Sequence, residues 1–392
     1  MRSPLKFCAL LALTTPAHAT WQSLGIPPSN TGASITLHAF HLGQLTVPGG
    51  AADMIHPVLP GREDFLAPLY AFLLDHPSGR RVMWDIGVRK DVENAVPPLA
   101  AVFEAFPNAL QQSKDIVEVL GESGVALESI EAVIHAHIDH IGDMSRFPNA
   151  TDIVVGDEAD LSFYVDNPKS QLQPSDLAGH NVKRVAFAKS KLAIGGLAAV
   201  DYFDDGSLYL LHTPGHRSGH MSPLVRVTTS PPSFVLLGGD AAHHVGSARP
   251  SPLLQKNFPC PIHALTHAAH AVSTEHFWSP GSALGKFDIL SRAPPMLALS
   301  DLPDGIEEDP VRARVSLDKL ATFDADVDVL FVIAHDASIV ADLPVFPETL
   351  NGWKKRGLKE KIVWRFLEEG NPAFIFSPVV EDEGVGRDFG EL

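Results

Sequence analysis

Three observations predict a layered α/β fold. Short apolar runs alternate with amphipathic stretches along the chain, as expected where helices cover a sheet. Four of these runs lead at once into His or Asp beside a glycine or polar turn, and buried strands of α/β proteins commonly end in polar residues at one sheet edge. The chain of 392 residues is 45% hydrophobic and 20% charged, which is enough apolar material for one large core.

The early part of the chain is predicted to hold three strands and one helix. The strands cover residues 34–41, 68–75 and 81–87, which are short apolar runs, the last one ending in a glycine turn. A helix is predicted over residues 111–121, where apolar side chains recur at helical spacing. The four later runs are predicted to be buried strands: 130–135, 208–212, 234–238 and 327–333.

A Pro- and Ser-rich segment, residues 245–310, interrupts this pattern and contains only one helical stretch, residues 261–276. We interpret it as a long insertion or lid within one domain, residues 34–369, and not as a second domain. No internal repeat is visible.

The end of that domain is predicted to be an amphipathic helix over residues 350–369, followed by a C-terminal tail, residues 370–392. The apolar side chains of the helix are those of Trp353, Ile362, Trp364 and Phe366.

Residues 1–19 have the features of a secretory signal peptide. Arg2 and Lys6 give a positive start, residues 7–13 form a short apolar run, and residues 17–19 have the small-x-small form of a cleavage site. A secreted protein is one interpretation, and a disordered N-terminus on a cytoplasmic protein is the other.

The overall charge and the cysteine count argue against several classes of partner and of structural site. A formal net charge of −17 argues against a nucleic-acid partner, which needs clustered Lys and Arg. Two cysteines are too few for a disulfide framework or a cysteine zinc site. No later apolar run is long enough to span a bilayer, and a small-molecule substrate is the expected partner.

Nineteen histidines make metal ligation the first chemistry to test, and four ligand-competent side chains stand within six residues: His135, His137, Asp139 and His140. Residues two apart in an extended segment point the same way, so His135 and His137 can face one cation. Asp139 and His140, after a sharp turn, can address a second point close by. Zinc readily takes imidazole nitrogen and carboxylate oxygen, so the segment predicts a metal site.

The motif H-x-H-x-D-H resembles the signature of the metallo-β-lactamase superfamily, and further elements of that family follow in the expected order. These elements are the early turn Asp85–Gly87, Thr213–His216, Gly238–Asp240 and Ala334–Asp336. The resemblance runs from about residue 34 to residue 340. It is closest to the N-acyl-homoserine lactonase-like branch, of the fungal metallo-hydrolase type.

The resemblance implies an αββα sandwich with two metals at one edge. The first metal would be bound by His135, His137 and His216. The second would be bound by Asp139, His140 and His335, and Asp240 would bridge the two. Two zinc ions are expected, although these ligand types also accept iron or manganese.

Such a pair of cations lowers the pKa of a shared water toward neutrality, so that hydroxide can attack a carbonyl carbon. Asp139 is a candidate to orient the nucleophile and pass its proton to the leaving group. The similar lactonases have a tyrosine three residues after the bridging carboxylate, and here that position is His243. His243 and His244 are expected near the pocket, and His220 is expected either to support a ligand or to have a structural role.

The function implied is opening of a lactone, or of a cyclic amide or carbamate, in a small molecule. A thioesterase of the glyoxalase II type is one alternative, although no set of Lys, Arg and Tyr side chains for its carrier group is recognisable. An iron-dependent oxidoreductase on the same fold is the other.

Overall fold

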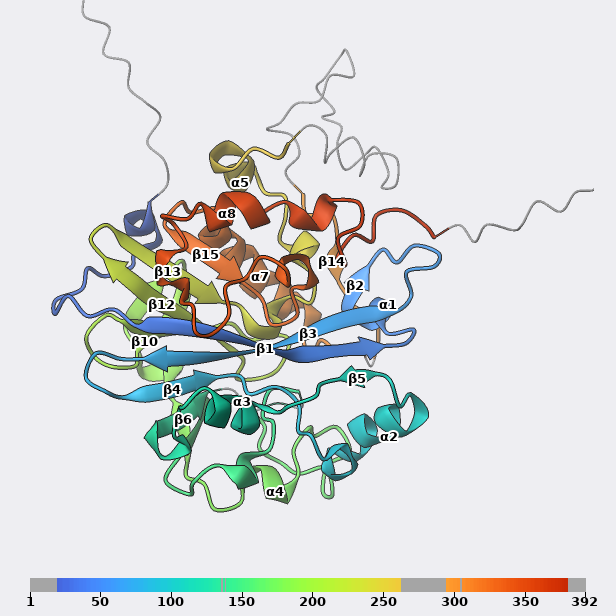
Figure 1. Cartoon of the computed structure of the whole chain (residues 1–392). Coiled ribbons are helices and arrows are strands. Elements are labelled where there is room, and N and C mark those ends of the chain that lie inside the picture. The colour runs from blue at the N-terminus through green and yellow to red at the C-terminus, as the bar shows by residue number, and fades with distance from the viewer. Residues whose placement is uncertain (1–19, 135–136, 138, 262–293, 304, 380–392) are drawn as a thin grey trace, which may run out of the picture.

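Two β-sheets form the centre of the protein in the computed structural model (Figure 1), which describes residues 20–134, 137, 139–261, 294–303 and 305–379. The possible signal segment, His135, most of the stretch 261–276 and the end of the tail lie outside the described residues. Within the described part, no helix is both long and apolar enough to cross a membrane.

The first sheet contains seven strands. In spatial order they are β5 (Leu110–Gln111), β1 (Thr36–Val47), β3 (Phe65–Asp75), β4 (Arg81–Trp84), β6 (Ile130–Ile134), β7 (Asp152–Gly156) and β8 (Val182–Val185). The pairs from β4 to β8 are parallel, and those of β1 with β3 and of β3 with β4 are antiparallel.

The second sheet contains six strands. Their spatial order is β15 (Val329–Val332), β13 (Pro232–Leu237), β12 (Met221–Thr229), β11 (Leu208–His212), β10 (Leu197–Asp201) and β9 (Leu192–Ile194). A short ribbon pairs β14 (Ala298–Leu299) with β2 (Ile55–His56), which ties residues 298–299 to the early part of the chain.

Helices cover the outer faces of the sheets. In Figure 1, α2 (Pro97–Ala105), α3 (Ile116–Glu122) and α4 (Pro174–Leu177) lie on one side, and α5 (Pro252–Asn257), α7 (Pro310–Asp324) and α8 (Leu358–Ile362) lie on the other. The one-turn helix α1 (Ala51–Met54) precedes β2. The predicted layered α/β fold is therefore confirmed.

Successive side chains of a strand point to opposite faces of its sheet, and this alternation explains why the second sheet packs against the first sheet on one face and against helices on the other. In β11, Leu208 and Leu210 belong to a buried cluster with Trp84 and Ile134 of the other sheet. Their neighbours Tyr209 and Leu211 belong to a second buried cluster, together with side chains of α7. Because successive side chains point to opposite faces, both faces of the strand are buried, and the run is almost continuously apolar.

Two predicted helices were wrong in extent. Asp115 accepts a hydrogen bond from the amide of Glu118, and the Glu118 carboxylate accepts one from the amide of Asp115, so α3 begins at Ile116. The preceding residues 110–111 pair with β1 instead.

Residues 350–369 form three short elements and not one helix. These are η11 (Leu350–Gly352), α8 and η12 (Arg365–Leu367). Gly357 has a φ of 63°, a left-handed conformation that interrupts a helix. The four apolar side chains predicted to face the core are nevertheless all buried.

Lys359 joins this C-terminal segment to the second sheet. Its buried ammonium donates hydrogen bonds to the carbonyl oxygens of Asp324, Asp326 and Val329, at the end of α7 and the start of β15. These carbonyls would otherwise be unpaired in the core. Lys359 therefore connects α8 to the end of α7 and to the start of β15.

Replacing Lys359 by methionine is expected to lower the free energy of unfolding by about 3 kcal/mol or more, because a side chain of similar length leaves the three carbonyls without a donor. Urea denaturation would measure the loss. Lys361→Met is the matched control in the same helix, since Lys361 is largely exposed and its pairing with Asp342 should contribute only about 0–1 kcal/mol. Equal effects of the two substitutions would contradict this account.

Candidate metal centre

The strand directions bring the chemically active residues to one edge of the sandwich. β4 and β6 are parallel neighbours in the first sheet, and β13 and β15 are parallel neighbours in the second. β11 runs in the same direction as β13, because both are antiparallel to β12. Residues that directly follow these strands therefore meet at the same end, where α/β proteins build their sites.

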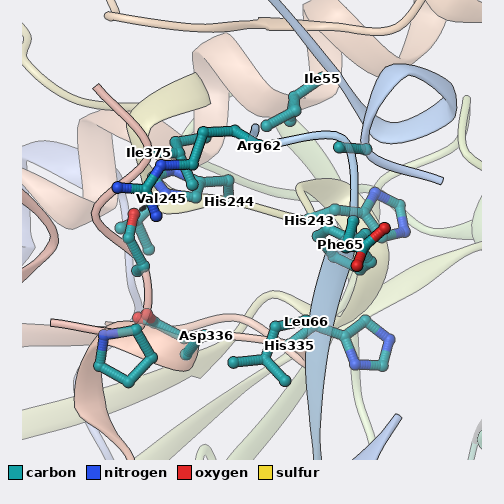
Figure 2. A pocket seen from close by; sticks show the side chains of 15 residues that line it. Ile55, Arg62, Phe65, Leu66, His243, His244, Val245, His335, Asp336 and Ile375 are labelled. Carbon is teal, nitrogen blue, oxygen red and sulfur yellow. Dashed lines mark hydrogen bonds between the residues drawn. The ribbon is translucent and has the colours of Figure 1, made fainter. Parts of the chain in front are cut away.

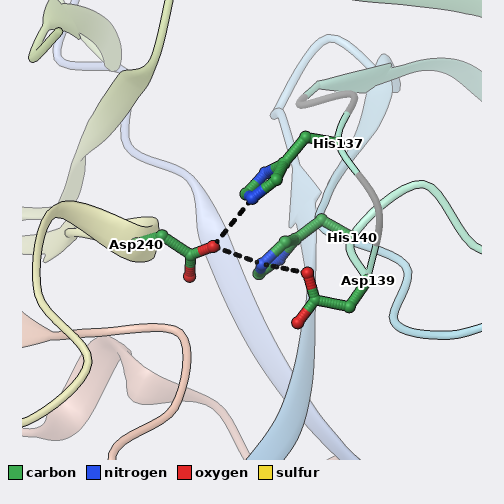
Figure 3. Close-up of side chains that lie close together, drawn as sticks. All are labelled: His137, Asp139, His140 and Asp240. Atoms are coloured by element: carbon green, nitrogen blue, oxygen red, sulfur yellow. Dashed lines mark hydrogen bonds and ion pairs between the residues drawn. The ribbon is translucent and has the colours of Figure 1, made fainter. Parts of the chain in front are cut away.

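The Asp240 carboxylate faces His137 and His140 (Figure 3). Its Oδ2 atom is 3.1 Å from Nε2 of His137, 2.9 Å from Nε2 of His140 and 3.4 Å from Nε2 of His216. The Nε2 atoms of His137 and His216 are themselves only 2.9 Å apart. Three imidazole nitrogens aimed at one point form the donor arrangement of a metal site.

A second group of donors lies on the other side of Asp240. Nε2 of His335 is 3.3 Å from Oδ1 of Asp240 and 3.2 Å from Oδ2 of Asp139. The other carboxylate oxygen of Asp139 is 3.4 Å from Nε2 of His140. His335 donates its Nδ1–H to the carbonyl oxygen of Pro68 at 3.0 Å, so Nε2 is the nitrogen that faces the cluster.

The electrostatics of the cluster favour positive charge. Burial opposes the charged form of His335, but Asp240 and Asp139 outweigh burial and raise the pKa of His335 to about 10. The same two carboxylates and Asp85 raise the pKa of His140 against the effect of burial. In return, His140 and His335 hold the pKa of Asp240 well below its usual range despite its burial. Asp139 and Asp240 thus stabilise positive charge beside His140 and His335, whereas burial lowers the pKa values of His216 and His243.

The residues present fit a metal. Ligand atoms of His137, Asp139, His140 and Asp240 all lie within 4.8 Å of one another, and so do those of His216, Asp240 and His243. Of the predicted ligands, every one that the structure describes belongs to the cluster. His135 lies outside the described residues.

His220 and His244 have contrasting positions. Nε2 of His220 accepts a hydrogen bond from the amide of Asp240 at 3.2 Å, and its Nδ1 is 3.0 Å from the carbonyl oxygen of Thr213. His220 therefore holds the backbone that carries Asp240. His244 accepts from the amide of Gly246 and donates to the carbonyl oxygen of Ala373, so both of its nitrogens are occupied by backbone groups.

Asp85, directly after β4, contacts the ring nitrogen of His140 that faces away from the cluster. Its Oδ2 atom is 3.1 Å from Nδ1 of His140, opposite the nitrogen that faces the cluster. Asp85 has a φ of 55°, a backbone conformation that non-glycine residues adopt at a cost of about 1–3 kcal/mol. The turn aims this carboxylate at the ring and fixes its orientation.

We expect Asp85→Ala to weaken metal binding by about 10–100-fold, the usual effect of losing the carboxylate partner of a metal-bound histidine. Competition with a zinc chelator on purified protein would measure it. Asp91→Ala is the control, because Asp91 is a partly exposed carboxylate that pairs with Arg89 at 2.7 Å. Unchanged metal affinity in Asp85→Ala would show that His140 needs no support.

Glu307 is a site residue that the sequence did not reveal. It is buried, with one carboxylate oxygen 3.6 Å from Nδ1 of His216 and the other 3.8 Å from Nδ1 of His243. Burial and the nearby Asp240 raise the pKa of Glu307 to about 8, and a cation held by the cluster would act in the opposite direction. Glu307 and Glu308 stand side by side in the sequence, and adjacent glutamates ordinarily indicate a solvent-exposed segment.

A small pocket, with a cavity volume of about 50 Å³, lies beside His243 and His335 (Figure 2). Its walls are mainly apolar, from residues such as Ile55, Phe65 and Leu66. Arg62 is the only Lys or Arg among the residues described as lining it.

Comparisons with known proteins agree with this architecture. A model of the metallo-beta-lactamase superfamily matches residues 69–335. The metallo-hydrolase mfmC of Annulohypoxylon moriforme is 38% identical, over 81% of this chain and 82% of its own. The gamma-lactamase FDB1 of Fusarium pseudograminearum is 33% identical, over 82% of this chain and 79% of its own.

Two further similarities concern a longer protein and a solved structure. The cytochrome P450 monooxygenase mpaDE of Penicillium roqueforti is 32% identical over 88% of this chain, which spans only 38% of that protein's length. An N-acyl homoserine lactone hydrolase solved with N-hexanoyl-L-homoserine at its catalytic metal center shares the fold, with a TM-score of 0.51 and 18% identity over 81% of this chain and 99% of the other. The strand-end cluster, the sandwich and the family match together place this chain in the metallo-beta-lactamase superfamily.

Proposed function

We propose that this protein is a zinc-dependent hydrolase that opens the ring of a small lactone, or of a cyclic amide or carbamate. The observation that carries the proposal is the convergence of three imidazole nitrogens on one oxygen of Asp240, with His335 and Asp139 on the other side. This arrangement suits two cations that share one carboxylate.

We assign the ligands as the family resemblance implies. His135, His137 and His216 would hold the first ion. Asp139, His140 and His335 would hold the second, and Asp240 would contact both. Bound zinc would supply a water of lowered pKa as the nucleophile and would polarise the substrate carbonyl.

The chain's own groups then orient the reactants. The Asp139 side chain keeps 14% of its surface exposed, so its carboxylate can hold the attacking water and pass a proton to the leaving atom at the pocket. His243 lines the same pocket, three residues after Asp240, and can contact the substrate carbonyl. The mainly apolar walls would face the apolar part of a bound small molecule.

Ring opening is favoured over other hydrolyses by the relatives. A gamma-lactamase that matches along most of its length is a cyclic-amide enzyme by its name. The shorter match to the N-acyl homoserine lactonase AttM of Agrobacterium fabrum, 34% identical over 46% of this chain, adds a cyclic ester. Both ring types present a carbonyl and a leaving atom held in one small molecule.

The decisive experiment is a screen of lactones, lactams, cyclic carbamates and acyl thioesters on zinc-loaded protein, with and without a chelator. We expect cyclic substrates to be opened, and the activity to disappear with the metal and return when zinc is restored. Oxygen uptake is measured in parallel on iron-loaded protein. Preferential thioester cleavage, oxygen consumption, or full activity without metal would each overturn the proposal.

A further inference from the structure

Glu307 lies between two histidines of the site and contacts neither closely enough for an ordinary hydrogen bond. Oε2 of Glu307 is 3.6 Å from Nδ1 of His216, and Oε1 is 3.8 Å from Nδ1 of His243. Within the described part of the chain, neither oxygen has a hydrogen-bond partner, and the same holds for Nδ1 of His216 and for both nitrogens of His243. All three side chains are almost fully buried.

Such a set of buried polar atoms is costly unless its members satisfy one another. An unpaired buried polar group costs about 1–3 kcal/mol, and an ionised carboxylate costs more. The two gaps exceed the usual 2.7–3.2 Å of an N–H···O bond by only a few tenths of an ångström. A small movement of the Glu307 side chain or of either ring would close them.

We propose that Glu307 is a positioning residue that accepts the Nδ1–H of His216 with one carboxylate oxygen and the Nδ1–H of His243 with the other. Both rings are then held in the tautomer whose Nε2 atom carries a lone pair. The proposal rests on the proposed function, in which His216 binds a metal ion.

The two hydrogen bonds have different consequences. For His216, Nε2 faces His137 and Asp240, so a carboxylate on Nδ1 orients the ring and strengthens it as a ligand. For His243, the hydrogen bond fixes a ring that lines the substrate pocket and leaves Nε2 as its free nitrogen. One carboxylate therefore couples metal binding to the placement of a group beside the substrate.

Zinc affinity tests the His216 contact without any substrate. Chelator competition should show a loss of about 10–100-fold in Glu307→Gln, because one side of the amide cannot accept an N–H. The matched control is Glu308→Gln: Glu308 is exposed and its carboxylate accepts from the hydroxyl of Ser218 at 2.8 Å. Wild-type affinity in Glu307→Gln would overturn the proposal, whereas absence of zinc binding in the wild type would instead refute the proposed function.

A spectroscopic measurement separates positioning from general structural support. On cobalt-loaded protein, Glu307→Gln should shift the visible absorption bands, since the orientation of His216 changes, and Glu308→Gln should not. Glu307→Asp, which keeps the carboxylate on a shorter side chain, should recover part of the affinity. Identical spectra for all variants would overturn the proposal, as would an aspartate variant no better than the glutamine variant.

A double-mutant cycle tests the His243 contact through catalysis. His243→Ala should lower kcat and leave zinc affinity within about twofold of wild type. If Glu307 acts through His243, adding Glu307→Gln to His243→Ala should reduce kcat by clearly less than it does in the wild-type protein. Full additivity in kcat would contradict the contact with His243.

Discussion

Replacing Asp240 by asparagine is expected to lower the rate of hydrolysis by at least about a thousandfold, or roughly 4 kcal/mol of transition-state stabilisation. Asparagine keeps the shape of the side chain but removes the negative charge and one acceptor oxygen. Oδ2 of Asp240 faces three imidazole nitrogens and Oδ1 faces His335, so the substitution affects both halves of the cluster. The zinc bound per chain should therefore fall by about half or more.

Zinc content is measured by elemental analysis after gel filtration. Activity is measured with the substrate that the wild-type protein hydrolyses fastest in the screen of lactones, lactams, carbamates and thioesters. Glu158→Gln is the control, since Glu158 is a largely exposed carboxylate whose partner is Arg312 at 3.0 Å. It should keep its zinc and its rate within about twofold. An Asp240→Asn protein with full zinc content and full rate would refute the role of Asp240 as the shared ligand.

The strand-end residues were predictable because they are of metal-ligand type and because each follows an apolar run that predicts a strand. His137, Asp139, His140, His216, Asp240 and His335 each follow a buried apolar run, and the directions of the strands bring these ends together. The layered fold followed from the same runs. The proposed assignment of these residues to two metal ions comes from the resemblance to a known family, because spacing alone left it open.

Three features were missed, one because it depends on contacts between distant segments and two because of local signals that hydrophobic periodicity does not carry. Glu307 reaches His216 and His243 from an acidic stretch whose local sequence indicates exposure. The helix predicted over residues 350–369 failed because side-chain periodicity cannot reveal the left-handed backbone at Gly357. The start of α3 was misplaced because the reciprocal capping of Asp115 and Glu118 outweighs the helical spacing before it.

Gly215 packs against the backbone of α7 and directly precedes His216, so it connects the helix to the site. Gly215→Ala is expected to be strongly destabilising. The φ of Gly215 is 137°, and a Cβ there would lie 2.0 Å from the amide nitrogen and 2.2 Å from the Cα of Ala313. These are backbone atoms in the first turns of α7, so no side-chain rotation can relieve the clash. The amide of Asp309, which caps α7, also donates to the carbonyl oxygen of Gly215 at 2.8 Å.

The alanine variant must move either α7 or the turn that carries His216. We expect the free energy of unfolding to fall by about 3 kcal/mol or more, and zinc affinity to fall with it as the ring of His216 is displaced. Urea denaturation and chelator competition measure the two effects. Gly121→Ala in α3 supplies a control of opposite sign: the added methyl group would have no atom within 4 Å beyond its chain neighbours and its own helix backbone, so it should stabilise the protein by about 0.5–1 kcal/mol. Wild-type stability and zinc affinity in Gly215→Ala would mean that α7 can shift freely, and that the close packing of this helix does not hold His216 in place.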